Sequence, residues 1–235
     1  MSPKRILIVR AGVPGPVVMA RHGDFVRWFE DTVGPGLQMA VVDGVQGPLP
    51  AVTGCDGVVV TGSFDSVTRL SPWMEALGRW LVEVGQTVPV LGVCFGHQLL
   101  GHALGGRVER NPLGPEAGTR EIELTEAGRE DPLFRGLSER FLAQESHEDQ
   151  VAHAPPGAVV LARNGHSPVQ AFAHGPFIRG IQFHPEFSGE RCRDLCREEA
   201  KQLDAARPGL AQEAEASIRE APEASQVLRN WVREF

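Results

Sequence analysis

Short apolar runs alternate with longer amphipathic stretches through the first half of the chain. The runs predict strands at residues 5–9, 37–42, 57–61 and 88–93. Apolar positions at helical spacing predict helices at 22–33, 73–84 and 97–104, and Ser71-Pro72 is a good start for the second. The runs at 37–42 and 57–61 are apolar throughout, so we expect both in the middle of a sheet, covered on both faces. This rhythm predicts a mostly parallel sheet with crossover helices.

The pattern changes in the second half of the chain. Strand-like runs follow one another with few helices between them, at residues 107–109, 119–124, 140–144, 158–162, 169–173 and 177–183. We expect these runs to form a more antiparallel part of the same mixed sheet. From Gly189 onward the strand signals stop, and Pro208-Gly209 divides the tail into two predicted helices. The expected fold is an α/β three-layer sandwich, with a domain at 1–190 and a helical extension at 191–235 packed on it.

Composition and charge narrow the possible partners. With 235 residues, 42% of them hydrophobic, the chain can close one sizeable core. Its formal charge of −7 and the lack of a basic cluster argue against nucleic acid as a partner. No apolar run approaches the roughly 20 residues of a membrane span, and the N-terminal run is too short for a signal peptide. The four cysteines are scattered, unlike a secreted disulfide framework. We therefore expect a cytoplasmic protein without membrane contact.

The segment Gly92-Val93-Cys94-Phe95-Gly96 lies where an apolar strand meets a helix. Glycines on both sides of a central cysteine predict a nucleophile elbow, a turn so tight that it thrusts the central side chain clear of the sheet. The N-terminus of the following helix favours a thiolate, and the backbone N–H of Phe95 is placed to bind a developing oxyanion. The alternative, a small buried residue without chemistry, is preferred for the other cysteines. No Cys/His set completes a zinc shell, so neither a metal nor a cofactor is predicted.

The last apolar strand runs into Phe183-His184-Pro185-Glu186. We expect Glu186 to reach His184, because residues two apart on a strand point to the same face. A carboxylate in that position holds the tautomer of the ring and stabilises the imidazolium. Cys94 and His184 both follow strands at the carboxyl edge, where open α/β sheets place their sites. The sequence thus predicts an amide hydrolase with Cys94 as nucleophile, His184 as base and Glu186 as the group that orients the base.

The elbow, continued through His97-Gln98, and the Phe183-His184-Pro185-Glu186 motif together resemble the class I glutamine amidotransferases. The resemblance runs from about residue 6 to 187. It implies a flavodoxin-like fold and attack of Cys94 on the side-chain amide of glutamine, followed by cleavage of a γ-glutamyl thioester by water. It also implies an oxyanion hole formed by Gly62 with Phe95. The substrate-binding positions that it implies are Gln98 and the segment Ser146, His147, Glu148 and Asp149.

The oxyanion loop departs from the family pattern. Many members have glycine and proline there, whereas this chain reads Gly62-Ser63-Phe64-Asp65. We place Ser63 and Phe64 among the substrate-binding residues, and we expect the bulky Phe64 to narrow or reshape the pocket. The γ-glutamyl class of substrates is therefore better supported than glutamine itself.

Several functions are compatible with these residues. One is a glutaminase that passes ammonia to a separate synthetase partner, since the chain has no phosphate loop of its own. A second is a free-standing γ-glutamyl peptidase, and both need the same Cys94, His184 and Glu186. A third, a non-catalytic interaction module of the same fold, is disfavoured by that intact set. A fourth, acyl transfer of the homoserine acyltransferase kind, would need another acceptor site in place of residues 146–149. The sequence leaves the first two open.

Overall fold

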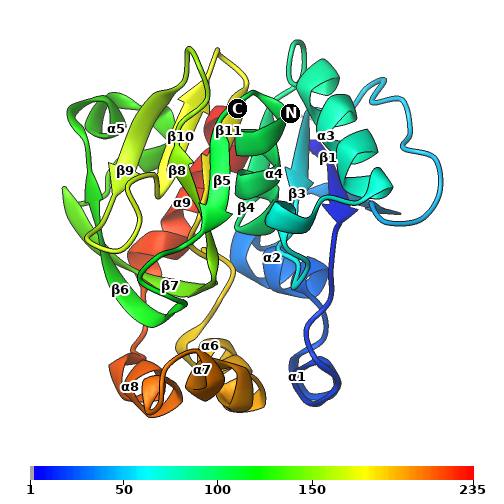
Figure 1. The fold of residues 1–235 in the computed structure, drawn as a ribbon. Helices are drawn as coiled ribbons and strands as arrows, with labels where there is room; N and C mark the ends of the chain where they lie inside the picture. Colours follow the sequence, from blue (N-terminus) through cyan, green and yellow to red (C-terminus); the bar gives the residue numbers. More distant parts are fainter. Residues whose placement is uncertain (1–2) are drawn as a thin grey trace.

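The computed structural model describes residues 3–235. A nine-stranded sheet crosses the molecule in the order β2-β1-β3-β4-β11-β10-β9-β6-β7 (Figure 1). Its strands are β1 (Arg5–Arg10), β2 (Gln38–Asp43), β3 (Gly57–Val60), β4 (Val90–Val93), β6 (Glu116–Leu124), β7 (Arg140–His147), β9 (Val159–Arg163), β10 (Ala171–His174) and β11 (Ile178–Ile181). The strands from β2 to β11 in this order pair in parallel, and the rest pair antiparallel. The predicted mixed sheet is confirmed.

The helices vary in length from 5 to 13 residues. They are α1 (Pro16–His22), α2 (Phe25–Val33), α3 (Pro72–Val84), α4 (Phe95–Ala103), α5 (Glu126–Glu130), α6 (Gly189–Glu198), α7 (Ala200–Ala206), α8 (Leu210–Ser217) and α9 (Pro222–Glu234). Short 3-10 turns occur at η1 (Val67–Arg69) and η2 (Pro132–Phe134). No helix within residues 3–235 combines the length and the apolar character needed to cross a bilayer.

Alternate residues of the parallel strands point into two different cores. In β1, Ile6 and Ile8 join a core that includes α2 and α9, whereas Leu7 and Val9 join one that includes α3 and α4. Because neighbouring residues of a strand face opposite sides of the sheet, helices must cover both faces. Figure 1 shows this arrangement, with α3 on one side and α9 on the other. The predicted three-layer α/β sandwich is confirmed.

Two predicted strands occupy other positions in the sheets than expected. The run at 37–42 was expected in mid-sheet, yet β2 is an edge strand that pairs only with β1, and Val41 is exposed. An apolar run does not distinguish an edge strand from a covered one when only some of its side chains reach the core. The run at 107–109 was expected in the main sheet, but β5 (Arg107–Arg110) instead pairs with β8 (Asp149–His153) in a separate two-stranded sheet. β8 itself escaped prediction because its sequence, DQVAH, is mostly polar.

Two helix predictions were also incomplete. The helix expected at 22–33 is present as α2, which begins at Phe25, and the preceding helix α1 was not predicted; Gly23, whose φ of 77° is left-handed, ends α1 and separates the two. The two helices expected after Gly189 are four, α6 to α9, although Pro208-Gly209 does separate α7 from α8 as predicted. A further break falls at Glu199 between α6 and α7, and Pro222 starts α9.

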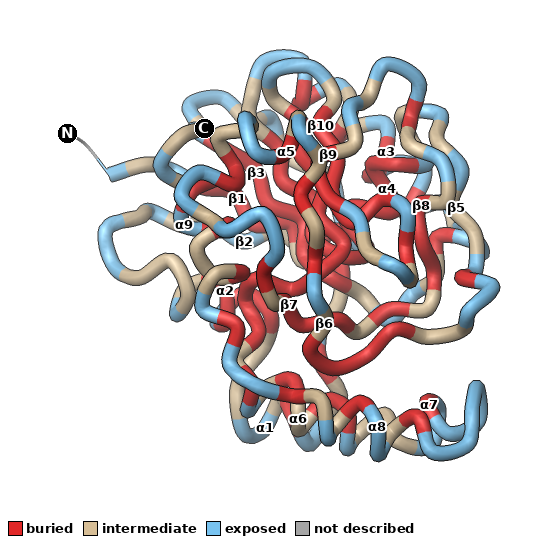
Figure 2. The backbone as a smooth tube through the Cα atoms, turned by 90° about the vertical axis from the view of Figure 1, so that its left-hand side faces the viewer, coloured by how far each residue is buried: buried red, intermediate tan, exposed pale blue. Residues whose placement is uncertain are grey.

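A third core lies away from the two faces of the sheet. It joins α1 and the N-terminal part of α2 to α6, α7 and α8, through residues such as Val18, Trp28, Leu195 and Leu203. Figure 2 shows α1, α6, α7 and α8 side by side beneath the sheet. This group of helices covers the region into which the carboxyl ends of β4 and β11 lead. The division of the chain at residue 190 stays a prediction.

Candidate active site

Cys94 makes the turn between β4 and α4 alone, since β4 ends at Val93 and α4 begins at Phe95. Among residues 3–235 it is the only residue other than glycine with a positive φ, 50°. Such a conformation costs about 1–3 kcal/mol and persists only where the surroundings impose it. A Cβ on Gly92 would lie 2.4 Å from the carbonyl oxygen of Gly96, so the backbone leaves no room for a side chain. The tight turn that the sequence predicted is present.

The segment that follows β11 brings an imidazole and a carboxylate together. The Nδ1–H of His184 donates to Oε1 of Glu186 at 2.8 Å, and both side chains are buried. The backbone reason for expecting this contact was wrong, because β11 ends at Ile181, His184 forms only an isolated β-bridge with Gln144, and Pro185-Glu186 form a turn. His184 is fixed instead by a backbone hydrogen bond to Gln144 in β7, 2.9 Å long. The Phe187 ring stacks on the imidazole at 3.9 Å between centroids.

The electrostatics of His184 link it to the cysteine. Burial alone would lower the pKa of His184, but the charges of Glu186 and Cys94 and their hydrogen bonds to the ring outweigh it and raise that pKa to about 10. Because Nδ1 is occupied by Glu186, Nε2 is the ring nitrogen left for Cys94. Gly62 packs against both residues: a Cβ on Gly62 would lie 3.1 Å from Cε1 of His184 and 3.9 Å from Cβ of Cys94. A histidine that is cationic at neutral pH therefore adjoins the sulfur.

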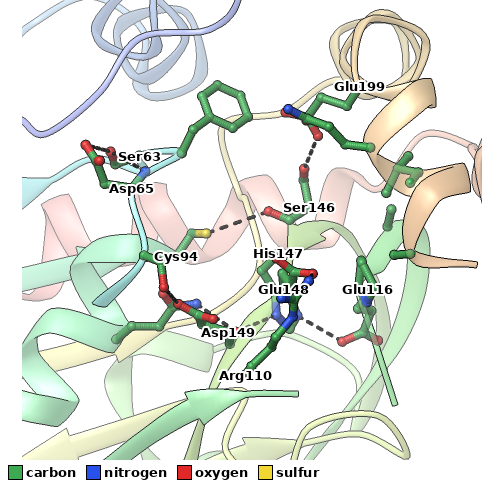
Figure 3. A pocket seen from close by; sticks show the side chains of 18 of the residues that line it. Ser63, Asp65, Cys94, Arg110, Glu116, Ser146, His147, Glu148, Asp149 and Glu199 are labelled. Carbon is green, nitrogen blue, oxygen red and sulfur yellow. Dashed lines mark hydrogen bonds and ion pairs between the residues drawn. The ribbon is translucent and has the colours of Figure 1, made fainter. Parts of the chain in front are cut away.

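A cavity of about 520 Å³ opens in front of Cys94 (Figure 3). It is within the usual size range of small-molecule sites. The residues predicted from the sequence that line it are Ser63, Phe64, Cys94, Gln98, Ser146, His147, Glu148 and Asp149. Gly62, Phe95, His184 and Glu186 lie outside the lining, and of these His184 is the buried partner of the sulfur. The structure thus brings the predicted binding residues to one cavity, with the predicted base behind the nucleophile.

Several predicted binding residues are held by neighbours on the β8 side of the cavity. Nε2 of Gln98 donates to the carbonyl oxygen of Asp149 at 2.8 Å and to Oε1 of Gln182 at 3.1 Å. The Asp149 carboxylate accepts a hydrogen bond from Ser66, 2.5 Å long. Glu148 pairs with Arg110, a residue that no sequence motif singled out. These contacts fix the positions of Glu148 and Asp149 at the cavity.

The ring of His147 is buried beneath the cavity instead of pointing freely into it. Its Nδ1 lies 2.9 Å from the carbonyl oxygen of Asp149, and its Nε2 lies 3.0 Å from Glu116 and 3.3 Å from Glu145. Burial lowers the pKa of His147, but the two carboxylates outweigh this and raise it well above its usual value. Burial also raises the pKa of Glu145 to about 7, assisted by the charge of Glu116. Both carboxylates were missed, since a Glu in a strand gives no signal of burial.

Two groups of side chains have the spacing to hold a cation. Ligand atoms of Glu116, Glu145 and His147 lie within 4.8 Å of one another, as do those of His22, Glu190 and Asp194. In the first group the imidazolium of His147 already supplies the positive charge between the carboxylates. In the second, Arg21 pairs with both acidic residues. Neither group needs a metal ion to account for its charges.

Glu199 is the cavity residue whose role the sequence least suggests. It lies between α6 and α7, and its Oε2 accepts a hydrogen bond from Ser146 at 3.4 Å. Its Oε1 is buried and has no hydrogen-bond partner among the described residues. Burial raises the pKa of Glu199 to about 7, partly opposed by Ser146 and by the charge of His184. In the sequence it is one glutamate among several in a charged tail, so only the fold sets it apart.

A sequence model described as glutamine amidotransferase class-I matches residues 38–199. The matched span is more than half of the chain and includes Cys94, His184 and Glu186. The chain therefore belongs to the class I glutamine amidotransferase family, and the resemblance seen in the motifs is confirmed.

Within this family the curated relatives include GMP synthases. The chain is similar to a glutamine-hydrolyzing GMP synthase subunit from Saccharolobus solfataricus, with 44% identity over 140 residues, 59% of this chain and 71% of that protein. It is also 41% identical over 133 residues to the GMP synthase of Thermomicrobium roseum, covering 55% of this chain and 23% of that protein. The chain thus spans about a quarter of the length of the GMP synthases from Thermomicrobium roseum and Aeropyrum pernix.

Solved structures share the fold along the whole chain. A glutamine amidotransferase from Thermotoga maritima superposes with a TM-score of 0.75 at 19% identity, covering 100% of this chain and 98% of that one. A glutamine amidotransferase from Methylobacillus flagellatus gives a TM-score of 0.65 at 26% identity, covering 99% and 91%. The first of these likenesses concerns the fold alone.

Proposed function

We propose that this protein is a Cys-His-Glu amidohydrolase that cleaves the γ-amide of glutamine or a γ-glutamyl amide bond. The observation that carries the proposal is the juxtaposition of Cys94, at its strained turn, with a His184 that Glu186 holds and keeps cationic. A sulfur beside an imidazolium, at the N-terminus of a helix, is the arrangement that favours a reactive thiolate. The family membership of the chain supports the same chemistry.

In the first half of the reaction, the Cys94 thiolate attacks the amide carbon and the carbonyl oxygen becomes an oxyanion. Phe95 is the first residue of α4, so its backbone N–H has no acceptor within the helix and can donate to that oxygen. The backbone N–H of Gly62 is the second proposed donor. His184 then gives the proton on Nε2 to the departing nitrogen, the C–N bond breaks, and ammonia or an amine leaves.

In the second half, water replaces the amine. His184, now neutral, removes a proton from that water, and the resulting hydroxide attacks the γ-glutamyl thioester. The C–S bond breaks, glutamate is released, and the sulfur returns to the thiolate beside the imidazolium. Glu186 remains ionised throughout, holding the ring with Nε2 toward the sulfur.

Two uses of this chemistry are compatible with the cavity. Relatives named as glutamine-hydrolyzing subunits of GMP synthase support a glutaminase that passes ammonia to a separate synthetase partner. The second candidate, a γ-glutamyl peptidase, is favoured by the size of the cavity, about 520 Å³. Glutamine is a small ligand for such a cavity, since pockets of roughly 300–1,000 Å³ hold drug-sized molecules. We also propose residues 1–190 as the amidotransferase domain that carries Cys94, His184 and Glu186, and 191–235 as a helical extension packed on it.

The test is to trap the intermediate. The purified chain is incubated with glutamine, with a γ-glutamyl dipeptide and with a glutamine-mimicking electrophile, and it is then analysed by peptide mass spectrometry alongside glutamate release. We expect one adduct, on Cys94, and none in Cys94→Ala. The matched control Cys55→Ala should keep the adduct, since Cys55 lies outside the cavity lining. An adduct elsewhere, or no adduct and no glutamate with any substrate, would overturn the proposal.

A further inference from the structure

The end of the cavity opposite the β8 side is built by the C-terminal helices. Its lining there comes from Glu199, Gln202, Leu203, Ala205 and Ala206. α6 ends at Glu198 and α7 begins at Ala200, so Glu199 stands at the corner between them. Figure 3 shows its side chain reaching down toward Ser146, while Asp149 and Arg110 lie at the far end and Cys94 lies between. The cavity therefore extends from the sulfur in two directions.

The carboxylate of Glu199 is incompletely satisfied. One oxygen accepts the 3.4 Å hydrogen bond from Ser146, and the other is buried without a partner among the described residues. A buried carboxylate is costly unless it is paired with a charge or several hydrogen bonds. Burial is the main cause of the raised pKa of Glu199, about 7, which shows that the ionised carboxylate is poorly stabilised. A positively charged ligand group beside this carboxylate would supply the missing partner.

Other acidic residues of the cavity already have partners. Glu148 pairs with Arg110, Glu116 pairs with His147, and Asp149 accepts from Ser66. Asp65 accepts a hydrogen bond from Ser63, 3.4 Å long. Two of these carboxylates are paired with a cationic side chain, and none of the four has a buried oxygen without a partner among the described residues. Glu199 differs because one of its oxygens is buried and has no partner there.

The position of Glu199 relative to the sulfur says which part of a substrate would meet it. Ser146 joins the two, because its carbonyl oxygen is 3.8 Å from Sγ of Cys94 and its hydroxyl contacts Glu199. Asp149 lies on the opposite side of the cavity (Figure 3), and Gln98 donates to its carbonyl oxygen, so we place the amino-acid end of the substrate there. The Glu199 end is therefore left for whatever is attached to the γ-nitrogen.

We propose that Glu199 binds the ammonium group of an aminoalkyl substituent on the γ-nitrogen, so that the preferred substrates are γ-glutamyl amides of diamines and polyamines. This inference rests on the proposed hydrolase function and names its substrate class. Leu203 and Ala206 supply apolar surface for the methylene chain between the two nitrogens. Cleavage would release glutamate and the free amine, by the same thioester steps given above.

The test uses two substrates of matched length that differ in a terminal charge. These are the γ-glutamyl pentylamide and the γ-glutamyl monoamide of diaminobutane, compared by kcat/KM in the wild type, in Glu199→Gln and in Glu198→Gln. We expect the wild type to favour the cationic amide by about ten- to hundredfold, the range for a hydrogen bond to a charged group. Glu199→Gln should bring the ratio close to one. Glu198→Gln removes the same charge one residue away, where the carboxylate faces α1, and should keep the wild-type ratio.

The outcomes separate this inference from the function on which it rests. If the wild type hydrolyses both amides with equal efficiency, or if Glu199→Gln keeps the wild-type ratio, the amine subsite is wrong while the hydrolase stands. Equal losses on both amides in Glu199→Gln would assign the residue to the shared glutamyl part and also overturn the inference. If neither amide nor glutamine forms a thioester on Cys94, the proposed function itself fails. The ratio of kcat/KM between the two amides is measured on the wild type alone, so the inference can be tested even if a variant misfolds.

Discussion

The two ends of the cavity are built on different principles. At the Cys94 end, each group is held by another: Glu186 holds His184, Phe187 stacks on the ring, and the glycines of the elbow allow the backbones to touch. At the Glu199 end, a buried carboxylate has one weak contact and an oxygen without a partner among the residues that the structure describes. Oε2 of Glu186 is also buried without a hydrogen-bond partner among the described residues, but its carboxylate holds a cationic imidazole. The Glu199 carboxylate contacts only a neutral hydroxyl, so its buried negative charge is left without a cationic partner among those residues.

The difference between the two ends shows that bond cleavage and discrimination between substrates place different requirements on a site. Bond cleavage needs groups fixed in advance, because any reorganisation would add to the barrier. Discrimination between substrates is served by a group that is poorly satisfied on its own, since a matching ligand then gains more than a mismatched one. Substitutions at the Cys94 end should therefore abolish turnover, and those at the Glu199 end should change substrate ratios and stability.

The largest effect is expected for Cys94→Ser. A hydroxyl is a far weaker acid and a poorer nucleophile than a thiol, so hydrolysis should fall by more than about 10³-fold. The melting temperature should stay close to that of the wild type, because the two side chains are nearly the same size. Glutamate release and a thermal melt measure the two quantities. Retention of most of the activity would remove Cys94 from the mechanism.

A smaller loss is expected for Glu186→Gln than for His184→Ala. The first weakens the orientation of the base, roughly a 10- to 10²-fold effect, whereas the second removes the base and should approach the loss in Cys94→Ser. Losing the Glu186 charge should also lower the pKa of His184 from about 10, because that charge helps to raise it. The imidazolium would then be lost at a lower pH, so the alkaline limb of the kcat/KM profile should shift downward. Equal losses, with no shift of the limb, would give the carboxylate another role.

Phe64→Gly tests the loop between the two ends. Phe64 is 55% exposed and lines the cavity, so its ring can limit the γ-substituent. We expect the ratio of kcat/KM between glutamine and bulky γ-glutamyl amides to change by roughly tenfold, about 1.4 kcal/mol. A gain for bulky amides would mean that Phe64 restricts the wild type to glutamine. An unchanged ratio would show that the ring points away from the reacting groups.

The smallest effect is a change of stability in Glu199→Gln. The folded protein raises the pKa of Glu199 to about 7 from a usual value of 4.5, so the folded state binds the extra proton. The bound proton stabilises the folded state fully below the pKa of the unfolded chain, and this stabilisation is lost as the pH rises through about 7. The variant should match the wild type near pH 4.5 and exceed it by about 1 kcal/mol at pH 8, after discounting for partial exposure. Denaturant unfolding at both pH values measures the difference, and a variant less stable at pH 8 would contradict it.

The sequence predicted the Cys94 end well and the Glu199 end hardly at all. Cys94 and His184 stand in local motifs whose spacing carries geometric meaning, since glycines mark the elbow and a proline marks the turn after β11. Glu116, Glu145 and Glu199 acquire their environment only when distant segments pack around them. A glutamate in a charged tail looks the same whether it faces water or a cavity.

The secondary structure shows the same contrast between features set by local sequence and features set by distant contacts. Buried strands such as β3 and β4 were located because every residue in them is apolar, whereas the mostly polar β8 was missed and the edge position of β2 was misjudged. His97, to which the motif gave no role, is buried, with Nε2 3.2 Å from the carbonyl oxygen of Val169. Burial lowers its pKa to about 3, so it stays neutral. Pattern predicts what is local, and tertiary contacts decide the rest.

The third core, which joins α1 to α6, α7 and α8, has a consequence for how such a protein can diversify. It is separate from the two cores that cover the sheet, and it includes Phe187, which stacks on His184. Mutations in these helices can therefore accumulate without disturbing the reacting groups, provided that the cluster stays packed and Phe187 keeps its place on the ring. Because one corner of the same helices forms a wall of the cavity, each such change is also a trial of a new substrate. Lineages that share one chemistry can in this way diverge in what they act on.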